Sequence, residues 1–447
     1  MAAKSPSLQA DAINQRSLAL HARYRGKVQM LPKCPISGLD DFSVWYTPGV
    51  AAPCLAIKDA PERAYEFTNK GNLVAVVSNG TRVLGLGNIG PLAGLPVMEG
   101  KALLFKYLGG VDAVPLCIRA KTPDDIVRTV EAIAPSFGGI NLEDISQPDC
   151  FRVLGAARER LDIPVWHDDQ QGSATVAMAG LLNALSIVGK RLDGIRICLV
   201  GIGAANFATY RLLRHAGVSP GAIVACDSKG TLHRGRDDIA AIQDAFREKW
   251  EVCRDTNADN VRGGIDAALR GADVCIAFSS SGPGVINPEW IRGMKRDAIV
   301  FACANPVPEI WPTDAKAAGA RIVATGRSDM PNQVNNALVF PGIFRGVLDV
   351  RASTISDDMA IAAAHALAAA IPRKDLSVDR ILPSLDEPHV AADIAAATGV
   401  AAQEKGLAQI KLTREELRTR AVKAIAAARA ATQLLMKERQ IASAPAP

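Results

Sequence analysis

The amino-acid sequence predicts an α/β protein with parallel sheets, followed by C-terminal helices. Residues 122–169 alternate helical and strand-like segments, and residues 195–324 repeat the alternation, which is typical of parallel strands joined by crossover helices. From Ser356 onward the chain is mostly Ala-rich and helical in pattern. Because 447 residues exceed what one hydrophobic core usually supports, we expect an N-terminal α/β domain, a doubly wound second domain and a helical appendage.

The overall charge argues against nucleic-acid binding. The formal net charge is +5, which is small for this length, and Lys and Arg form no dense block. A mildly basic balance is compatible with an acidic metabolite as substrate but does not establish one.

The cysteines and apolar segments indicate a soluble, cytoplasmic protein. Nine cysteines are widely spaced and mostly lie in apolar runs, so they indicate buried thiols in a reducing compartment and not disulfides or a zinc site. Residues 1–17 contain no apolar signal-peptide core. The longest apolar segment, residues 360–371, is too short to span a bilayer. We therefore expect no membrane segment.

The first candidate for proton transfer is a tyrosine. Tyr46 follows a helix-compatible segment at residues 7–24 and a loop, and it directly precedes a rigid Thr-Pro-Gly turn. A tyrosine held in this way can donate a proton, although a lone tyrosine is more often an aromatic anchor at a domain edge.

An Asn-Gly pair lies between two β-rich runs and predicts a β-hairpin. Residues 73–78 precede Asn79-Gly80, and residues 81–87 follow. Arg82 lies just beyond the turn, where its guanidinium could hold a carboxylate in bidentate geometry or simply be solvated.

A lysine opens the apolar run 102–105. Lys101 follows a Gly- and Pro-rich stretch. If it is partly desolvated, its pKa falls from about 10.4 towards 7 or 8, where it can act as a base. The alternative is a solvated lysine near the start of a helix.

Two pairs of carboxylates follow strand-like runs. Glu143-Asp144 follows residues 139–142, and Asp168-Asp169 follows residues 163–166. Adjacent acidic side chains converge only where a strand ends or bends. Three or four acidic oxygens meeting there would suit Mg²⁺ or Mn²⁺. Helix capping and solvation are the alternative for any single Asp, and His167 is expected to be a supporting or core residue.

The segment from Ile195 has the signature of a dinucleotide-binding unit. A buried-strand pattern leads into a Gly-Ile-Gly turn, a helix and a second strand that ends in an acidic residue. The helix N-terminus would receive a pyrophosphate. Asn206 replaces the third glycine, which weakens the match. The candidate cofactor-binding residues are Gly201, Gly203, Ala204, Ala205, Asp227, Ser228, Lys229 and Asn305.

Two amide-rich clusters follow the later strands of this unit. They contain Asn305 and Asn336 in Pro-bounded loops, where doubly wound folds bind ligands.

The residues at the end of the second strand favour different cofactors. Asp227 would accept hydrogen bonds from a ribose 2′-hydroxyl, which favours NAD⁺. Ser228 and Lys229 follow it, and a basic stretch at residues 233–236 could hold a 2′-phosphate. We expect NADP⁺ to be the better substrate, with NAD⁺ tolerated.

Eight motifs occur in order between about residues 40 and 350: Tyr46-Thr-Pro-Gly, Asn79-Gly-Thr-Arg-Val-Leu-Gly-Leu-Gly, Glu99-Gly-Lys, Asn141-Leu-Glu-Asp, His167-Asp-Asp-Gln-Gln-Gly-Ser, Gly201-Ile-Gly-Ala-Ala, Asn305-Pro and Asn335-Asn-Ala-Leu-Val-Phe-Pro-Gly. Together they resemble the malic enzyme family in its short bacterial form. Gln171, Ser173 and Asn206 depart from the usual family residues, and none of them is a proposed catalytic group.

The resemblance implies oxidative decarboxylation of L-malate to pyruvate and CO₂ with NAD(P)⁺ and Mg²⁺ or Mn²⁺. It implies a general acid, a general base and an acid beside the base at Tyr46, Lys101 and Asp168. It implies metal ligands at Glu143, Asp144 and Asp169. It implies substrate-holding residues at Arg82, Asn305 and Asn336.

The resemblance also divides the chain. It implies a catalytic domain at residues 1–170, an NAD(P)-binding Rossmann-type domain at 171–350 and a C-terminal helical extension at 351–447. A homodimer or higher homo-oligomer is the base-rate expectation. Two other functions stay open: a non-redox decarboxylase that makes lactate from malate, and a nucleotide-sensing protein without turnover.

Overall fold

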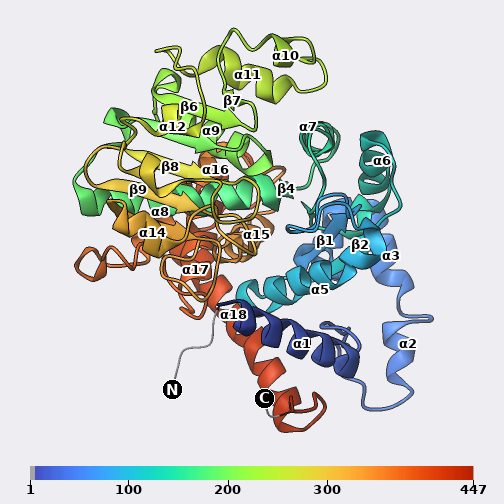
Figure 1. The fold of residues 1–447 in the computed structure, drawn as a ribbon. Coiled ribbons are helices and arrows are strands. Elements are labelled where there is room, and N and C mark those ends of the chain that lie inside the picture. The colour runs from blue at the N-terminus through green and yellow to red at the C-terminus, as the bar shows by residue number, and fades with distance from the viewer. Residues whose placement is uncertain (1–5, 446–447) are drawn as a thin grey trace.

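The computed structural model describes residues 6–445 and contains two β-sheets (Figure 1). The first sheet is parallel, with strand order β2-β1-β3-β4. Its strands are β1 (Leu73–Ser78), β2 (Asp112–Cys117), β3 (Gly139–Leu142) and β4 (Val165–His167). The helices of this half are α1 (Pro6–Tyr24), α2 (Asp41–Trp45), α3 (Ala51–Asp59), α4 (Ala64–Phe67), α5 (Gly90–Gly109), α6 (Pro123–Ile133) and α7 (Asp149–Arg160).

The second sheet has strand order β10-β9-β8-β5-β6-β7 and is parallel except for the short β7. Its strands are β5 (Ile197–Val200), β6 (Ile223–Asp227), β7 (Gly230–Thr231), β8 (Val274–Ala277), β9 (Ala298–Ala302) and β10 (Ala320–Thr325). After β6 the chain crosses to the other side of β5 to form β8, so the strand order reverses beside β5. Ligands of doubly wound sheets bind at this switch point. The predicted α/β architecture is confirmed.

Helices cover this second sheet and follow it. They are α8 (Ser173–Val188), α9 (Ala204–His215), α10 (Asp237–Ala240), α11 (Arg247–Asp255), α12 (Ile265–Leu269), α13 (Pro288–Ile291) and α14 (Pro312–Ala317), then α15 (Phe340–Asp349), α16 (Asp357–Ala369), α17 (Val390–Glu404) and α18 (Arg414–Lys437). Small residues allow α15 and α17 to cross closely: a Cβ added to Gly346 would lie 2.3 Å from the Ala395 carbonyl oxygen.

The predicted β-hairpin at Asn79-Gly80 is wrong. β1 pairs in parallel with β2 on one side and β3 on the other, so neither edge of β1 is left for a hairpin partner. Residues 81–87 instead form a loop closed by a single bridge between Val83 and Gly87. The turn serves to bring α5 against β1, because a Cβ at Gly80 would lie 2.3 Å from the Gly90 carbonyl oxygen.

An aromatic cluster joins the N-terminal sheet to the C-terminal helices. The ring of Phe105, on α5, lies 4.6 Å from that of Phe340 and 5.1 Å from that of Phe344, both on α15. All three are buried. Because Lys101 lies one helical turn before Phe105, this contact also fixes the position of Lys101.

One helical stretch is longer than the apolar segment singled out from the sequence. Among the described residues, only Asp168–Val188 has the length and composition to cross a bilayer, and it is mostly buried. Its main part, α8, packs against α9 and α16 as an internal helix of the second domain. Residues 360–371 lie within and just after α16, which spans 13 residues and is too short to cross a bilayer, as expected from the sequence.

Asn206 replaces the third glycine of the dinucleotide motif with a hydrogen-bonding role. It is fully buried, and its Nδ2 donates to the carbonyl oxygens of Val200, Gly201 and Ile276 at 3.0, 2.7 and 3.1 Å. The side chain thus fastens α9 to β5 and β8. Glycine at this position normally permits close packing of the helix on the sheet. Here the hydrogen bonds of the Asn206 amide stabilise that packing.

Candidate active site

Lys101 is buried between two carboxylates from neighbouring strand ends. Its Nζ lies 2.6 Å from Asp168 Oδ2 and 2.9 Å from Glu143 Oε1, and the side chain is 7% exposed. The Phe340 ring centroid lies 4.4 Å from Nζ. The prediction that this lysine is desolvated is therefore confirmed.

The predicted direction of its pKa shift is wrong. Burial alone would lower the pKa of Lys101, but the carboxylates of Asp168 and Glu143 raise it above its ordinary value. The two partners lie 67 and 42 residues further along the chain, so the local sequence around Lys101 could not reveal them.

Each of these carboxylates is held by a polar side chain two residues earlier. Asn141 Nδ2 donates to Glu143 Oε2 at 2.9 Å, and Trp166 Nε1 donates to Asp168 Oδ1 at 2.9 Å. Residues i and i+2 of a strand share one face. The sequence analysis missed Asn141 and Trp166 as supporting residues, although this spacing was the signal that could have found them.

The other two acidic residues lie beside this pair. The Asp144 backbone N–H donates to Asp169 Oδ2 at 2.8 Å, and Asp144 has a left-handed backbone with φ of 55°. Asp144 Oδ2 is buried and has no hydrogen-bond partner. Burial and the nearby Asp169 raise the pKa of Asp144 to about 8. Burial also raises the pKa of Glu143 well above its usual range, although Lys101 opposes this.

The donor set of this site fits a hard divalent cation. No three His, Cys, Asp or Glu side chains within residues 6–445 are already arranged around a common metal position, because Glu143 faces Lys101 and Asp169 accepts a backbone bond. However, Lys101 pairs with only two of the four carboxylates, and Asp144 leaves a buried oxygen unpaired. Oxygen donors with excess negative charge are what Mg²⁺ and Mn²⁺ select.

His167 is a buried residue of this region, as expected. It is fully buried, and burial lowers its pKa to about 3. Its Nδ1 lies 3.7 Å from Asp169 Oδ2, and neither ring nitrogen has a hydrogen-bond partner among the described residues.

Of the three predicted substrate-holding residues, Arg82 and Asn336 lie beside these carboxylates, and Asn305 contacts the loop that carries Arg82. The Arg82 backbone N–H donates to the Asp144 carbonyl at 3.0 Å, and its guanidinium is exposed. In the same loop, a Cβ on Gly85 would lie 2.8 Å from the Asn305 carbonyl oxygen. A Cβ on Gly172 would lie 3.1 Å from Asn336 Cβ and 1.9 Å from Asp168 Oδ1, so Asn336 lies beside Asp168.

Tyr46 is not brought into this cluster within one chain. It lies at the end of α2, is 70% exposed, and its hydroxyl forms no hydrogen bond with the described residues. Figure 1 shows α2 at the outer edge of the N-terminal half, away from β4.

The Gly-Ile-Gly turn is built for close approach of a ligand. Gly201 has φ of 79°, and a Cβ there would lie 2.8 Å from the Phe278 carbonyl oxygen. Gly203 precedes the first turn of α9, which contains Ala204 and Ala205, and a Cβ there would meet nothing within 4 Å. The turn therefore leaves open space in front of the free backbone amides of the α9 N-terminus, which suits a pyrophosphate.

Asp227 ends β6 as predicted, but its carboxylate is engaged within the protein. It pairs with Arg236 at 2.9 Å and with Lys249 at 2.6 Å. Ser228 and Lys229 follow it and are exposed.

Comparison with known proteins identifies the family. Residues 25–158 match the family model described as "Malic enzyme, N-terminal domain", and residues 170–403 match "Malic enzyme, NAD binding domain". The chain belongs to the malic enzyme family. The second match ends within the helices assigned from the sequence to a C-terminal extension.

The relatives of this malic enzyme share most of its length. It is 46% identical over 406 residues to the bifunctional malic/malolactic enzyme of Bacillus subtilis, covering 91% of this chain and 97% of that protein. A crystal structure of Entamoeba histolytica malic enzyme matches with a TM-score of 0.95 and 46% identity, covering 100% and 93% of the two chains. That of Pyrococcus horikoshii malic enzyme matches with a TM-score of 0.90 and 49% identity, covering 96% and 100%.

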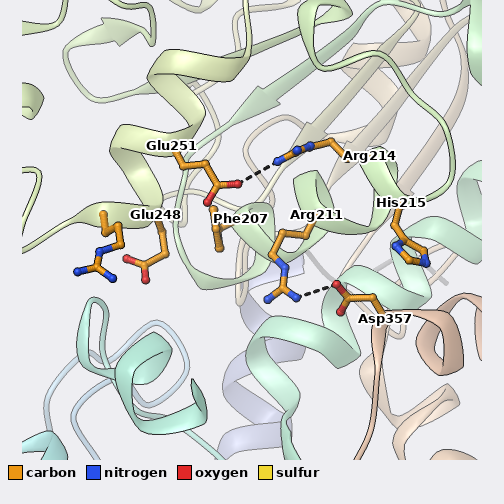
Figure 2. A pocket seen from close by; sticks show the side chains of 8 residues that line it. Phe207, Arg211, Arg214, His215, Glu248, Glu251 and Asp357 are labelled. Atoms are coloured by element: carbon orange, nitrogen blue, oxygen red, sulfur yellow. Dashed lines mark hydrogen bonds and ion pairs between the residues drawn. The ribbon is translucent and has the colours of Figure 1, made fainter. Parts of the chain in front are cut away.

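A separate pocket of this malic enzyme lies along α9 (Figure 2). Its volume is about 510 Å³, and its walls come from α9, α11 and the start of α16. Arg211 pairs with Asp357 at 2.7 Å and Arg214 with Glu251 at 3.0 Å, as the dashed lines in Figure 2 show. None of the predicted site residues lines it.

The contact between Gly172 and Asp168 gives a stability prediction. Gly172 has helical backbone angles that alanine accepts, but its Cβ would overlap the Asp168 carboxylate. Gly172→Ala should therefore lower the free energy of unfolding by about 1–3 kcal/mol through overpacking. Gly155→Ala, in α7 with open space around the new Cβ, should be neutral or stabilising by up to about 1 kcal/mol. Chemical denaturation measures both, and equal stability of the two variants would contradict this packing.

Proposed function

We propose that this protein oxidises and decarboxylates L-malate to pyruvate and CO₂ while reducing NAD(P)⁺. The observation that carries the proposal is the buried Lys101 between Asp168 and Glu143, at strand ends that face the second domain. The family matches over both domains and the glycine turn at the head of α9 support the same reaction.

In the proposed mechanism Lys101 is the general base. Because Asp168 and Glu143 raise the pKa of Lys101, its ammonium group must first release a proton, and a cation held by Glu143 would draw away one of the two carboxylates that raise this pKa. As hydride leaves C2 of malate for the nicotinamide ring, the neutral amine of Lys101 then takes the proton of the C2 hydroxyl. Asp168 lies 2.6 Å from Nζ and orients it. Arg82 matches a substrate carboxylate in bidentate geometry, and Asn305 and Asn336 supply amide donors on the side of the second domain.

We further propose Glu143, Asp144 and Asp169 as ligands of Mg²⁺ or Mn²⁺. Support comes from the unpaired Asp144 oxygen and from the raised pKa values of Glu143 and Asp144. When bound, the cation supplies Lewis-acid stabilisation of negative charge on the C2 oxygen and on the enolate left by CO₂.

The proposed cofactor preference is NADP⁺ over NAD⁺, with NAD⁺ accepted. The exposed Lys229 beside the end of β6 supports it. The proposed location is the cytoplasm, supported by nine cysteines that are all free thiols.

We also propose that the active protein is a homodimer. None of residues 12–72 is buried. The N-terminal arm, residues 28–67, exposes a row of large apolar side chains: Val28, Met30, Leu31, Ile36, Leu39, Phe42, Val44, Trp45, Leu55 and Phe67. Such a surface is typical of a subunit interface. The loop and helix start beside Arg82 also expose Leu84, Leu86 and Leu92.

The same interface accounts for Tyr46. If the arm packs on the exposed Leu84, Leu86 and Leu92 of a second copy, Tyr46 would lie close to that copy's carboxylates. Tyr46 would then protonate the enolate at C3 in the partner's site. Under this proposal each active site contains residues of two chains.

An activity assay tests the function. Malate, Mn²⁺ and either nicotinamide cofactor should give a rise in reduced-cofactor absorbance. Lys101→Ala should lower kcat by about 10² to 10⁴, the usual contribution of a general base. Lys106→Ala is the matched control, since Lys106 lies on the same helix but pairs with Asp112 near the surface, and it should stay near the parent rate.

Two outcomes would contradict this account. Lactate formed from malate without net cofactor reduction would favour the malolactic reaction, which the name of the Bacillus subtilis relative includes. Cofactor binding with no turnover would favour a sensor. Because removing one partner of a buried ion pair destabilises a protein, Lys101→Arg and a cofactor-binding measurement should accompany the alanine variant.

Mixing two inactive variants tests the shared site. Tyr46→Phe and Lys101→Arg homodimers should each have low activity. After dissociation and reassociation, heterodimers contain one site with both native residues, so about a quarter of all sites should regain activity. If Tyr46 serves its own chain, the mixture stays as inactive as its parents. Sedimentation that shows a monomer at assay concentration would also contradict the proposal.

A further inference from the structure

The acidic residue at the end of β6 has no acceptor position left for a ribose hydroxyl. Asp227 Oδ1 accepts from Arg236 Nη1 at 3.0 Å and from the Lys229 backbone N–H at 2.9 Å. Its Oδ2 accepts from Arg236 Nη2 at 2.9 Å and from Lys249 Nζ at 2.6 Å. In dinucleotide folds the residue at this place normally bonds the ribose 2′-hydroxyl. Here its two oxygens already bind four donors.

Arg236 alone does not neutralise Asp227, because it also binds Asp238. Its Nε lies 2.8 Å from Asp238 Oδ1, and its Nη2 lies 3.0 Å from Asp238 Oδ2. Against the effect of burial, hydrogen bonds from Arg236 and Lys249 hold the pKa of Asp227 below its usual range, so the carboxylate is ionised. Arg236 is only 8% exposed. It therefore belongs to the framework and not to the ligand surface.

Lys249 supplies the charge that tips this cluster positive. Lys229, Arg236 and Lys249 face two carboxylates, Asp227 and Asp238, since Lys229 Nζ lies 3.2 Å from Asp238. Without Lys249 the formal charges of these residues cancel. With Lys249 they sum to one positive charge. Lys249 comes from α11, which Figure 1 shows next to β6 and β7. Its side chain is 26% exposed.

We propose that Lys249 determines whether this site accepts a 2′-phosphate, by cancelling the negative charge of Asp227. A free aspartate at this position repels the phosphate of NADP⁺. A paired aspartate does not, and the exposed Ser228 and Lys229 can then donate to the phosphate. The proposal rests on the proposed NAD(P)-dependent function and assigns its cofactor preference to a residue outside the β6 segment.

The test is binding of adenosine fragments to the full-length protein, which needs no malate, metal or turnover. Adenosine 2′,5′-bisphosphate and adenosine 5′-monophosphate differ only in the 2′-phosphate. By calorimetry the parent should bind the bisphosphate more tightly. Lys249→Met should weaken bisphosphate binding by about tenfold or more, since a charge-assisted bond is at stake, and should change monophosphate binding by less than about twofold.

Controls separate this role from support of the fold. Lys249→Arg should restore the parent's preference. Arg247→Met removes a cation from the same helix, but Arg247 does not contact Asp227, so the preference should be unchanged. In an Asp227→Asn background Lys249→Met should weaken bisphosphate binding by less than about threefold, because there is no carboxylate charge to cancel.

Three results would overturn the proposal. The first is an equal loss of affinity for both fragments in Lys249→Met. The second is no loss of affinity for either fragment. The third is a loss of bisphosphate affinity that stays at about tenfold or more in the Asp227→Asn background. All three can be seen even in a protein that proves inactive with malate. Failure of this proposal is therefore distinguishable from failure of the proposed function.

Discussion

Four carboxylates and one buried lysine lie together at the edge of the N-terminal sheet, with the exposed Arg82 as the other cation nearby, and the rest of the site follows from this excess of negative charge. Parallel strands β3 and β4 end side by side, so the acidic residues that follow them meet; Glu143, Asp144 and Asp168 are buried, and Asp169 is partly exposed. Lys101 bonds two of them, Glu143 and Asp168. Of the other two, Asp144 has a buried oxygen without a partner and a pKa raised to about 8, and Asp169 accepts the backbone N–H of Asp144. A buried cluster in this state needs more positive charge.

The geometry of this cluster depends on contacts between the two domains. Lys101 is placed by α5, which is anchored through Phe105 to α15 of the C-terminal half. Asp168 packs against Gly172, where the chain enters the second domain. The loop that carries Arg82 touches Asn305 beyond β9. Residues of both domains therefore surround the same carboxylates, which is what a reaction between a metabolite and a dinucleotide requires.

Local patterns predicted much of this arrangement, and non-local pairing explains the rest. The strand ends at Glu143 and Asp168 and the glycine turn before α9 could be recognised because each depends on a few adjacent residues. The hairpin prediction failed because pairing of β1 with β2 and β3 is decided by segments that come later in the chain. The pKa of Lys101 and the ion pairing of the Asp227 carboxylate likewise depend on residues that are distant in the sequence. The position of Tyr46 depends on the proposed second chain.

The central claim is that the strand-end carboxylates hold one divalent cation, and Mn²⁺ binding followed by electron paramagnetic resonance tests it most directly. Asp144→Asn is the informative variant, because the oxygen without a partner makes no bond that the substitution would break. Asp193→Asn, at an exposed ion pair, is the control. The account predicts about one bound Mn²⁺ per chain in the parent and the control, and at least about tenfold weaker binding in Asp144→Asn. Equal Mn²⁺ affinity in all three proteins, or none in the parent, would contradict it.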